Sequence, residues 1–261
     1  IKNIPMISNN QHIYFGANDG YIYDLSGNGP NMLSQPIAPM HMMNPQHTGI
    51  TSYYGPNTTP TLTWTKSFGA TNLYVSPSIG VASNGTLYIG SNDGYVYALN
   101  PSGLTTKWQK KVNNSNIFTS PNSMYTTPAI GKNGTIYIGS NEGYMFALEP
   151  TNGNIKWKYN AGYPLQSSPI LDINDNIYFG AGQSVYSLTD GFDRAYSRWL
   201  RPFDTSANVN SSPALGKNGF LYFGSDDGYL YAVNSLTGVL QWKKNLSLPD
   251  TLITHPIYTS A

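Results

Sequence analysis

The stretch that decides the fold is "YIGSNDGYVYAL", from Tyr88 to Leu99. Two short runs of alternating apolar residues are joined by Ser, Asn, Asp and Gly, a pattern typical of a β-hairpin. Asn and Asp can bond to the local backbone and Gly tolerates a positive φ, so "SNDG" is predicted to be the tight turn. Near-copies occupy Tyr14 to Leu25, Tyr137 to Leu148 and Tyr222 to Val233. Only the turn residues recur with these copies, so the repetition indicates a structural role before a catalytic one.

The repeat has a period of 41 to 49 residues. The glycine that ends "YIG" or "YFG" is spaced by 49, 41 and 44 residues over its last four copies, and the five tryptophans are spaced by 44, 49, 42 and 43. Such a period indicates a solenoid, an array or a propeller. The residues concerned are Gly16, Gly90, Gly139, Gly180 and Gly224, and Trp64, Trp108, Trp157, Trp199 and Trp242.

Each repeat is predicted to form four short antiparallel strands. In the last complete copy these are "SSPALG" (211–216), "FLYFGS" (220–225), "YLYAVN" (229–234) and "VLQW" (239–242). One unit is apolar on both faces and must stack against the next. The sequence therefore predicts an all-β fold, a β-propeller of four-stranded antiparallel blades in one domain over residues 1–261.

The prediction comprises five recognisable repeats and the first strand of a sixth. Pro256, in "THPIYTSA" (254–261), follows Pro213 by 43 residues, as Pro213 follows Pro169 by 44. No second strand follows it, so the domain is expected to be incomplete at both ends. We expect either a longer natural polypeptide or a neighbouring chain that closes the ring.

The composition argues against nucleic acid and membranes as partners. The chain has 14 Lys and Arg against 13 Asp and Glu, a net charge of +1, which gives no broad attraction to nucleic acid. No apolar run approaches the roughly 20 residues that span a bilayer, so no membrane insertion is predicted. Cysteine is absent, which excludes disulfides and thiolate metal sites.

The segment "SPSIGVASNGTLYIGSNDGYVYALNPSGLTTKW" (76–108) resembles the pyrroloquinoline-quinone-like (PQQ-like) propeller repeat. "ALEPTNGNIKW" (147–157) and "AVNSLTGVLQW" (232–242) resemble its tryptophan docking motif, in which Gly ends a turn and Trp clamps neighbouring blades. The resemblance implies a structural role for all five tryptophans. Members of this superfamily include quinone-dependent dehydrogenases, a lipoprotein of outer-membrane protein assembly and extracellular domains without known chemistry.

A second resemblance concerns "PMHMMNPQHTG" (39–49), whose "PQHTG" is similar to a leader in secreted, cofactor-free members of that family. Those members usually carry an Arg-His pair where this chain has Met42 and Met43. Three predicted strands of a blade (5–26) precede the leader. Residues 27–60 are therefore expected to be either an insertion before a fourth strand or a junction between units.

The sequence lacks the residues that the enzymatic alternatives would need. By the same resemblance, a quinone dehydrogenase would need a longer ring, a calcium site, a catalytic Asp and, in many members, adjacent cysteines. A glycosidase needs converging carboxylates, but five of the thirteen acidic residues lie in the hairpin turns. We predict no catalytic residues, no metal site and no cofactor. The alternatives are a quinoprotein-type dehydrogenase fragment and a carbohydrate-binding propeller.

Two departures from the repeat are candidate polar sites. Asp24 stands where other repeats have alanine, and a carboxylate in that slot must find donors. A structural bond to residues 27–60 is expected, with a ligand or catalytic group as the alternative. His41 and His47 lie among methionines that could suit copper, although packing of this segment over the blades is the favoured interpretation.

The third departure, "GFDRAYSRWLRPFD" (191–204), contains all three arginines of the chain. With the aromatic residues between them they are a candidate protein interface, although a solvated, enlarged blade edge is the favoured interpretation. The candidate residues are Phe192, Arg194, Tyr196, Arg198 and Arg201.

The sequence is thus predicted to be a non-enzymatic protein-binding or assembly scaffold, with other protein chains as partners. Extracellular, cell-envelope, filament or virion surfaces are the expected location. Glycans are an open alternative, since N-x-S/T sequons occur at Asn57, Asn84, Asn113, Asn133, Asn210 and Asn245.

Overall fold

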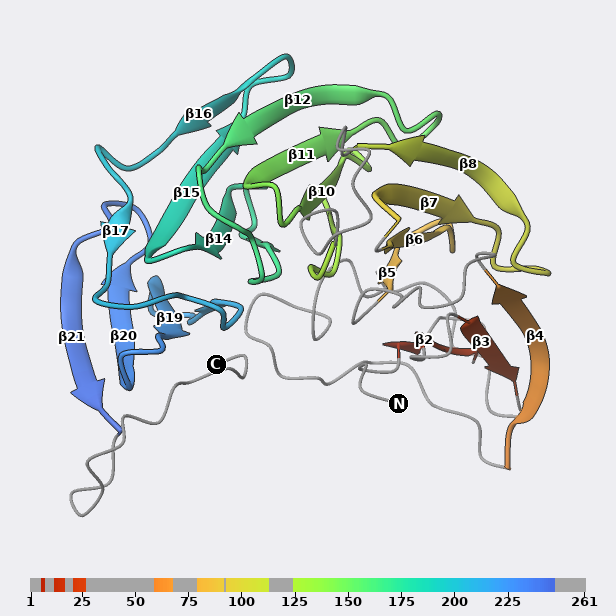
Figure 1. Ribbon diagram of the computed structural model, residues 1–261, viewed down its shortest axis with the longest axis horizontal. Helices are drawn as coiled ribbons and strands as arrows, with labels where there is room; N and C mark the ends of the chain where they lie inside the picture. The colour runs from red at the N-terminus through yellow and green to blue at the C-terminus, as the bar shows by residue number, and fades with distance from the viewer. Residues whose placement is uncertain are drawn as a thin grey trace.

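The computed structural model describes residues 6–7, 12–16, 21–26, 59–67, 79–91, 93–112 and 124–246. Within these ranges the chain forms five antiparallel sheets that follow one another along an arc, with the first sheet at one end and the fifth at the other (Figure 1). We call the sheets blades 1 to 5 in chain order. They confirm the predicted all-β propeller of four-stranded units. No helix in the described ranges could cross a membrane.

Blades 1 to 3 each contain four strands in sequence order. Blade 1 consists of β1 (Met6–Ile7), β2 (Ile13–Gly16), β3 (Tyr21–Ser26) and β4 (Thr61–Ser67). Blade 2 consists of β5 (Gly80–Val81), β6 (Leu87–Gly90), β7 (Tyr95–Leu99) and β8 (Thr106–Lys111). Blade 3 consists of β9 (Ala129–Ile130), β10 (Ile136–Gly139), β11 (Tyr144–Leu148) and β12 (Ile155–Asn160).

Blades 4 and 5 complete the arc, and blade 4 has a divided outer edge. Blade 4 consists of β13 (Ile170–Leu171), β14 (Ile177–Ala181), β15 (Ser184–Asp190), β16 (Ala195–Ser197) and β17 (Phe203–Asp204). Both β16 and β17 pair with β15, at opposite ends of it. Blade 5 consists of β18 (Ala214–Leu215), β19 (Phe220–Gly224), β20 (Tyr229–Asn234) and β21 (Leu240–Asn245).

The repeated "NDGY" motif forms the predicted hairpin turn. Gly94 has a φ of 81° and its N–H donates to the carbonyl of Ser91. The carboxylate of Asp93 accepts the N–H of Tyr95 at 2.9 Å. Blade 5 repeats this arrangement with Asp227 and Gly228, whose φ is 82°. The turn residues therefore recur in blades 2 and 5 because both turns need the same left-handed position and the same local acceptor.

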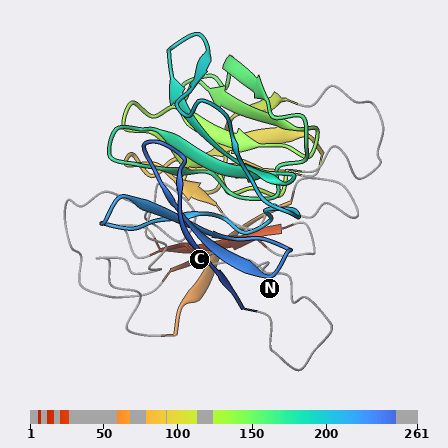
Figure 2. The same ribbon diagram turned by 90° about the vertical axis from the view of Figure 1, so that its left-hand side faces the viewer.

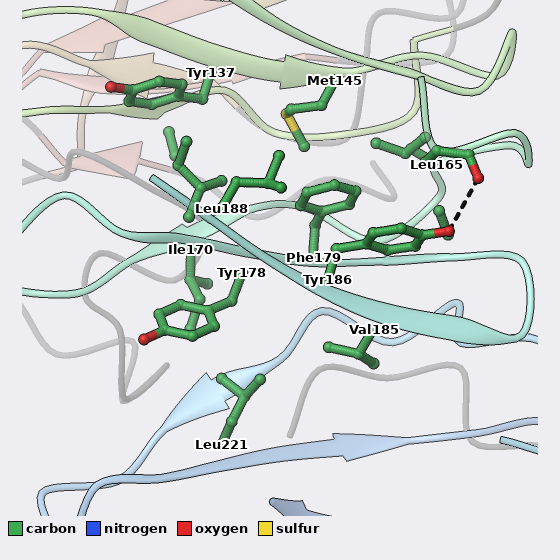
Figure 3. Packing of buried hydrophobic residues seen from close by; sticks show 14 of the residues in the cluster. Tyr137, Met145, Leu165, Ile170, Tyr178, Phe179, Val185, Tyr186, Leu188 and Leu221 are labelled. Carbon is green, nitrogen blue, oxygen red and sulfur yellow. Dashed lines mark hydrogen bonds between the residues drawn. The ribbon is translucent and has the colours of Figure 1, made fainter. Parts of the chain in front are cut away.

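The core lies between the blades. The largest buried cluster extends from blade 3 through blade 4 to blade 5 (Figure 3). Tyr186 stacks on Phe179 within blade 4, and its hydroxyl donates to the carbonyl of Ala161 at the end of blade 3. The ring of Tyr159 in β12 meets Tyr186 edge-on. Each blade thus completes the apolar core of its neighbour, as stacked repeats require.

Residues 27–58, with the "PQHTG" leader, and residues 247–261, with the proposed sixth-blade strand, lie outside the described residues. The strands on either side of the first segment are hydrogen-bonded neighbours, because Asp24 in β3 is opposite Trp64 in β4. Residues 27–60 therefore lie between the third and fourth strands of blade 1 in the chain.

Candidate functional site

Neighbouring blades are joined by a two-donor clasp. Trp108 Nε1 in blade 2 donates to the carbonyl of Pro150 in blade 3 at 2.9 Å, and the hydroxyl of Tyr88 donates to the same oxygen at 3.4 Å. Blade 4 repeats the arrangement toward the carbonyl of Ser235 in blade 5, with Trp199 at 3.0 Å and Tyr178 at 3.3 Å. One carbonyl in each acceptor turn thus receives a tyrosine and a tryptophan from the preceding blade.

A glycine in the acceptor turn makes room for the indole. Gly153 and Gly238 both have a φ of 71°. A Cβ atom at Gly153 would lie 2.6 Å from the ring of Trp108, and one at Gly238 would lie 2.7 Å from the ring of Trp199. Both the backbone conformation and the ring contact therefore require glycine at these positions.

Between blades 3 and 4 a carboxylate replaces the carbonyl. Asp190 accepts Trp157 Nε1 at 2.7 Å, the hydroxyl of Tyr137 at 2.8 Å and Lys156 Nζ at 3.1 Å. Its Oδ1 also accepts the N–H of Phe192. Burial raises the pKa of Asp190, but these hydrogen bonds outweigh it, so the pKa lies below its usual value. Asp190 is therefore an ionised structural group.

The tryptophans of the first and last blades are more exposed than the others. Trp64 lies opposite Asp24, and Trp242 lies opposite Ala232. Trp108 and Trp157 lie opposite Ala98 and Ala147 in the same register, so four of the five tryptophans share one strand position. Trp157 and Trp199 are 5% and 3% exposed, Trp108 is half-buried, and Trp64 and Trp242 are 49% and 42% exposed.

The candidate interface of blade 4 divides into one internal and four external residues. Arg198 reaches inward: its Nη1 donates to the hydroxyl of Tyr178 at 2.6 Å and to Ser187 Oγ at 3.2 Å. Lys107 and Lys156 hold the same place immediately before a clasp tryptophan. Arg198 is therefore partly buried among structural contacts.

The other four candidates lie on the outer edge of blade 4. Phe192 is 80% exposed and Tyr196 is 53% exposed, and Leu200 beside them is fully exposed. Arg194 pairs with the adjacent Asp193 at 3.2 Å, and Arg201 is exposed. We call Phe192, Arg194, Tyr196, Leu200 and Arg201 the blade-4 edge.

The polar candidate Asp24 is fully buried. Its Oδ1 lies 2.6 Å from His12 Nδ1, and among the described residues its Oδ2 has no hydrogen-bond partner. Most of the segment expected to bond Asp24, residues 27–58, lies outside the described residues, and the contact with His12 is not among the sequence predictions. His41 and His47 lie outside the described residues.

The described carboxylates mainly serve turns and clasps. Asp93 accepts the hydroxyl of Tyr97 at 2.6 Å, and Asp227 accepts that of Tyr231 at 2.7 Å. Asp172 accepts the N–H groups of two turn residues and the hydroxyl of Tyr178. Among the described residues no three His, Asp or Glu side chains gather as metal ligands. These described carboxylates therefore position backbone and aromatic groups.

These hydrogen bonds predict an alkaline transition. Burial, followed by the hydrogen bond to a carboxylate, raises the pKa of Tyr97, Tyr137 and Tyr231. Because the folded state holds these protons more tightly, their contribution to stability is complete below the usual tyrosine pKa of about 10 and is lost as the pH rises above it. Absorbance titration near 295 nm is expected to show these tyrosines ionising together with unfolding. Reversible ionisation of all 21 tyrosines with an unchanged circular dichroism spectrum would contradict this.

A cavity opens on the face formed by the turns between first and second strands. Its volume is about 1330 Å³, and blades 2 to 5 contribute to it. The lining includes the turn residues Asn84, Asn133 and Asp175 and the lysines Lys132 and Lys217. Asp175 is held by the backbone N–H of Lys132. The cavity has room for a polypeptide segment or a small polar ligand.

The comparisons with known proteins agree with this geometry. Residues 123–252, which contain the two well-formed clasps of blades 3 to 5, match a family model described as outer membrane protein assembly factor BamB. This match supports a PQQ-like repeat family. The leader motif and the cofactor-free secreted type are not part of that match. No curated protein sequence matches the chain.

Several solved structures share the fold, among them the following three. BamB from Moraxella catarrhalis is 13% identical, with a TM-score of 0.58 over 93% of this chain and 75% of that one. The computationally designed Ika8 protein is 14% identical, with a TM-score of 0.61 over 95% and 74%. The WD40 propeller domain of Doa1 is 10% identical, with a TM-score of 0.59 over 91% and 66%. At these identities the likeness establishes the fold alone, a β-propeller.

Sequence reasoning missed the role of Asp190 and did not anticipate the contacts of Arg198 with Tyr178 and Ser187. Asp190 occupies the repeat position of Pro150 and Ser235, so its departure from the repeat was a usable signal. Arg198 precedes a tryptophan as Lys107 and Lys156 do, and this alignment would have distinguished it from the other arginines.

Proposed function

We propose that this chain is a non-enzymatic scaffold that binds another protein through the blade-4 edge. The observation that carries the proposal is Phe192, a bulky aromatic residue that combines a φ of 76° with 80% exposure. A positive φ in such a residue costs of the order of 1–3 kcal/mol. Lys156 Nζ lies 5.6 Å from the centroid of its ring, but most of the side chain stays exposed and returns little burial energy to the folded chain. A backbone cost at a solvent-facing aromatic residue supports a role in binding.

The neighbours of Phe192 have the composition of a binding surface. Tyr196 and the fully exposed Leu200 add apolar area, and Arg194 and Arg201 add charge. Tyrosine and arginine are enriched among the residues that dominate binding energy in protein interfaces. The guanidinium groups favour a partner segment in which acidic residues adjoin apolar ones. Arg198, which faces inward, is not assigned to this surface.

The alternatives fit the structure less well. A carbohydrate-binding propeller would present a similar aromatic pocket on several blades, whereas Phe192 and Tyr196 belong to a segment unique to blade 4. A quinoprotein-type dehydrogenase would need uncommitted carboxylates, whereas the described Asp93, Asp172 and Asp190 serve turns and clasps.

An extracellular or cell-envelope location belongs to the same proposal. The matching family model carries the name of an outer-membrane protein assembly factor. Two sequon residues, Asn84 and Asn133, are exposed, although each also accepts a backbone N–H in its own turn. Glycosylation is therefore consistent with this location, but the proposal does not depend on it.

The substitution Phe192→Gly tests the proposal. Glycine tolerates the positive φ, so the free energy of unfolding is expected to stay the same or rise by about 1 kcal/mol. Peptides selected on the wild-type protein from a random dodecapeptide phage library are expected to pair acidic with apolar residues and to bind the variant at least about tenfold more weakly. Calorimetry of the selected synthetic peptides measures the difference.

The matched control is Leu236→Ser, which removes an apolar side chain that is 67% exposed in blade 5. This variant is expected to bind the selected peptides like the wild type. Leu200→Ser should weaken binding as Phe192→Gly does. Equal peptide affinity for the wild type and for both edge variants would refute a binding role for the blade-4 edge.

A further inference from the structure

Two of the interfaces between blades contain the same three hydrogen-bond donors: a tyrosine, a lysine and a tryptophan. Between blades 3 and 4 these donors surround the carboxylate of Asp190. Between blades 2 and 3 the carbonyl of Pro150 accepts the tyrosine and the tryptophan instead. The donors are Tyr137, Lys156 and Trp157 in blade 3, and Tyr88, Lys107 and Trp108 in blade 2. The interface between blades 2 and 3 thus has the donors found around Asp190, but a neutral carbonyl in place of the carboxylate.

The two lysines are held in the same way. Lys107 Nζ donates to Thr86 Oγ1 at 2.7 Å, and Lys156 Nζ donates to Thr135 Oγ1 at 2.9 Å. Each threonine is buried and lies 21 residues before its lysine. The tyrosine and tryptophan rings are 5.7 Å apart in blade 2 and 5.9 Å apart in blade 3, at interplanar angles of 40° and 36°. The three donors therefore have nearly the same arrangement in both blades.

The two lysines differ in their counter-ions. Lys156 lies 3.1 Å from Asp190, and the two side chains are 6% and 11% exposed. Lys107 is exposed, and its ammonium group forms no ion pair within the described part of the chain. Thr86 takes one of the three N–H donors of this ammonium group. A carboxylate placed at Lys107 would therefore complete the arrangement that blade 3 already shows.

The space beside Lys107 is part of the cavity of about 1330 Å³. Thr86, Tyr88 and Pro150, from the same interface, also line this cavity, and so does Thr151. Blades 2 and 3, drawn in yellow and green, lie side by side in both ribbon views (Figures 1 and 2). The ammonium group of Lys107 is thus accessible from a space large enough for a ligand.

The charge of the cavity lining favours an anion. Three lysines and two aspartates line the cavity, a net charge of +1. Both carboxylates already accept protein donors: Asp172 accepts two turn N–H groups and Asp175 accepts the N–H of Lys132. The charged lining residues are Lys107, Lys132, Lys217, Asp172 and Asp175.

We infer that the cavity binds a ligand whose carboxylate pairs with Lys107, as Asp190 pairs with Lys156. An ammonium–carboxylate hydrogen bond is about twice as strong as a neutral one, so this pair is the main contact of the ligand. A small organic acid and an acidic residue of a polypeptide both provide the group, and the experiment distinguishes them. The inference uses other residues than the blade-4 edge and goes beyond the proposed function.

A two-dimensional amide NMR titration with sodium succinate, at low and fixed ionic strength, tests the inference. The wild type is expected to show saturable shifts at Thr86 and Thr151, with a dissociation constant of the order of 1 mM for a ligand held mainly by one charged pair. Lys107→Met should weaken this binding at least about tenfold, the effect of losing one hydrogen bond between charged groups. Low ionic strength limits the screening of the pair.

Lys111→Met is the matched control. It removes the same charge from the same strand, β8, but Lys111 is not among the residues that line the cavity. This variant should bind succinate like the wild type. A comparison of the two variants therefore separates a contact with Lys107 from an effect of net charge.

Pro150→Asp provides the carboxylate from the chain itself. Pro150 occupies the repeat position of Asp190, so the new side chain is expected to pair with Lys107 and to weaken succinate binding at least about tenfold. Lys107 is retained in this variant, and circular dichroism shows whether each variant is folded. Succinate binding equal to that of the wild type in folded Pro150→Asp would contradict the equivalence of the two interfaces.

The blocked peptide acetyl-Gly-Asp-Gly-amide is titrated in parallel. It carries one carboxylate on a polypeptide backbone, whereas succinate is a small organic acid. Tighter binding of the peptide assigns the site to an acidic residue of a protein partner, and tighter binding of succinate assigns it to a small acid. Either result supports a carboxylate site, provided that Lys107→Met weakens it.

Two results overturn the inference. No saturable shift with either compound up to about 20 mM shows that the cavity does not bind a carboxylate. Binding that is unchanged in Lys107→Met shows that the anion is held by other residues. Neither result affects the test of the blade-4 edge, which depends on Phe192 and Leu200.

Discussion

Replacing Trp157 by alanine is expected to lower the free energy of unfolding by about 3–5 kcal/mol, the range for a buried aromatic side chain. The indole is 5% exposed, packs beside Tyr137 at 5.9 Å and donates to Asp190 across the interface between blades 3 and 4. Its removal creates a cavity and leaves one acceptor position of Asp190 empty. Urea unfolding followed by circular dichroism measures the change.

Trp242→Ala is the matched control for this prediction. Trp242 lies opposite Ala232 in the same register as Trp157 opposite Ala147, but its side chain is 42% exposed. Its removal is expected to cost less than about 1 kcal/mol when unfolding is measured on dilute protein. Equal losses in both variants would show that strand position, and not burial between blades, determines the contribution of each tryptophan.

Asp190→Ala is expected to lower the free energy of unfolding by about 3–5 kcal/mol, because it leaves a buried cation without its partner. The side chain of Lys156 is 6% exposed and lies 3.1 Å from the carboxylate. Trp157 and Tyr137 lose their acceptor in the same variant. Urea unfolding at neutral pH measures the loss.

The double variant Asp190→Ala with Lys156→Met separates the causes. Removing the ammonium group should restore a substantial part of the lost stability, since the orphaned charge no longer exists. A double variant as unstable as Asp190→Ala would show instead that the loss comes from the two aromatic donors.

Acid titration gives an independent measure of Asp190. Its pKa is lowered in the folded state, so its contribution to stability is present above the usual aspartate pKa of about 3.9 and is lost as the pH falls below that value. The wild type should lose stability in this range more steeply than Asp190→Ala. Parallel pH profiles would contradict the lowered pKa.

The blade repeat could be predicted from sequence because its determinants are local. The "NDGY" turn needs a side-chain acceptor at Asp93 and a left-handed residue at Gly94, and both are visible in four consecutive letters. The short apolar runs on either side specify β6 and β7, whose residues are buried on both faces apart from the partly buried Tyr95. The five sheets confirm this prediction of fold class.

The contacts between blades were only partly predictable. The spacing of the tryptophans indicated a common position, and the structure adds the acceptors, such as the carbonyl of Pro150 for Trp108, 42 residues away. Arg198 was assigned to an exposed interface with its neighbours, yet its guanidinium contacts Tyr178, 20 residues away, and the carbonyl of Ser235, 37 residues away. Composition places an arginine in a segment but does not tell on which side of a strand it lies.

The sequence alone determined the all-β class, the four-stranded unit and the hairpin turns, because these depend on side-chain period and on φ preferences within a few residues. Tertiary structure alone decided which side chains contact other blades and which are exposed. It brought Arg198 to Tyr178 and left Phe192 exposed, joined Asp24 to His12, and exposed Trp242 while burying Trp157. These outcomes depend on which blade packs against which, and burial and hydrogen bonding between distant segments have no signature in the period of a single strand.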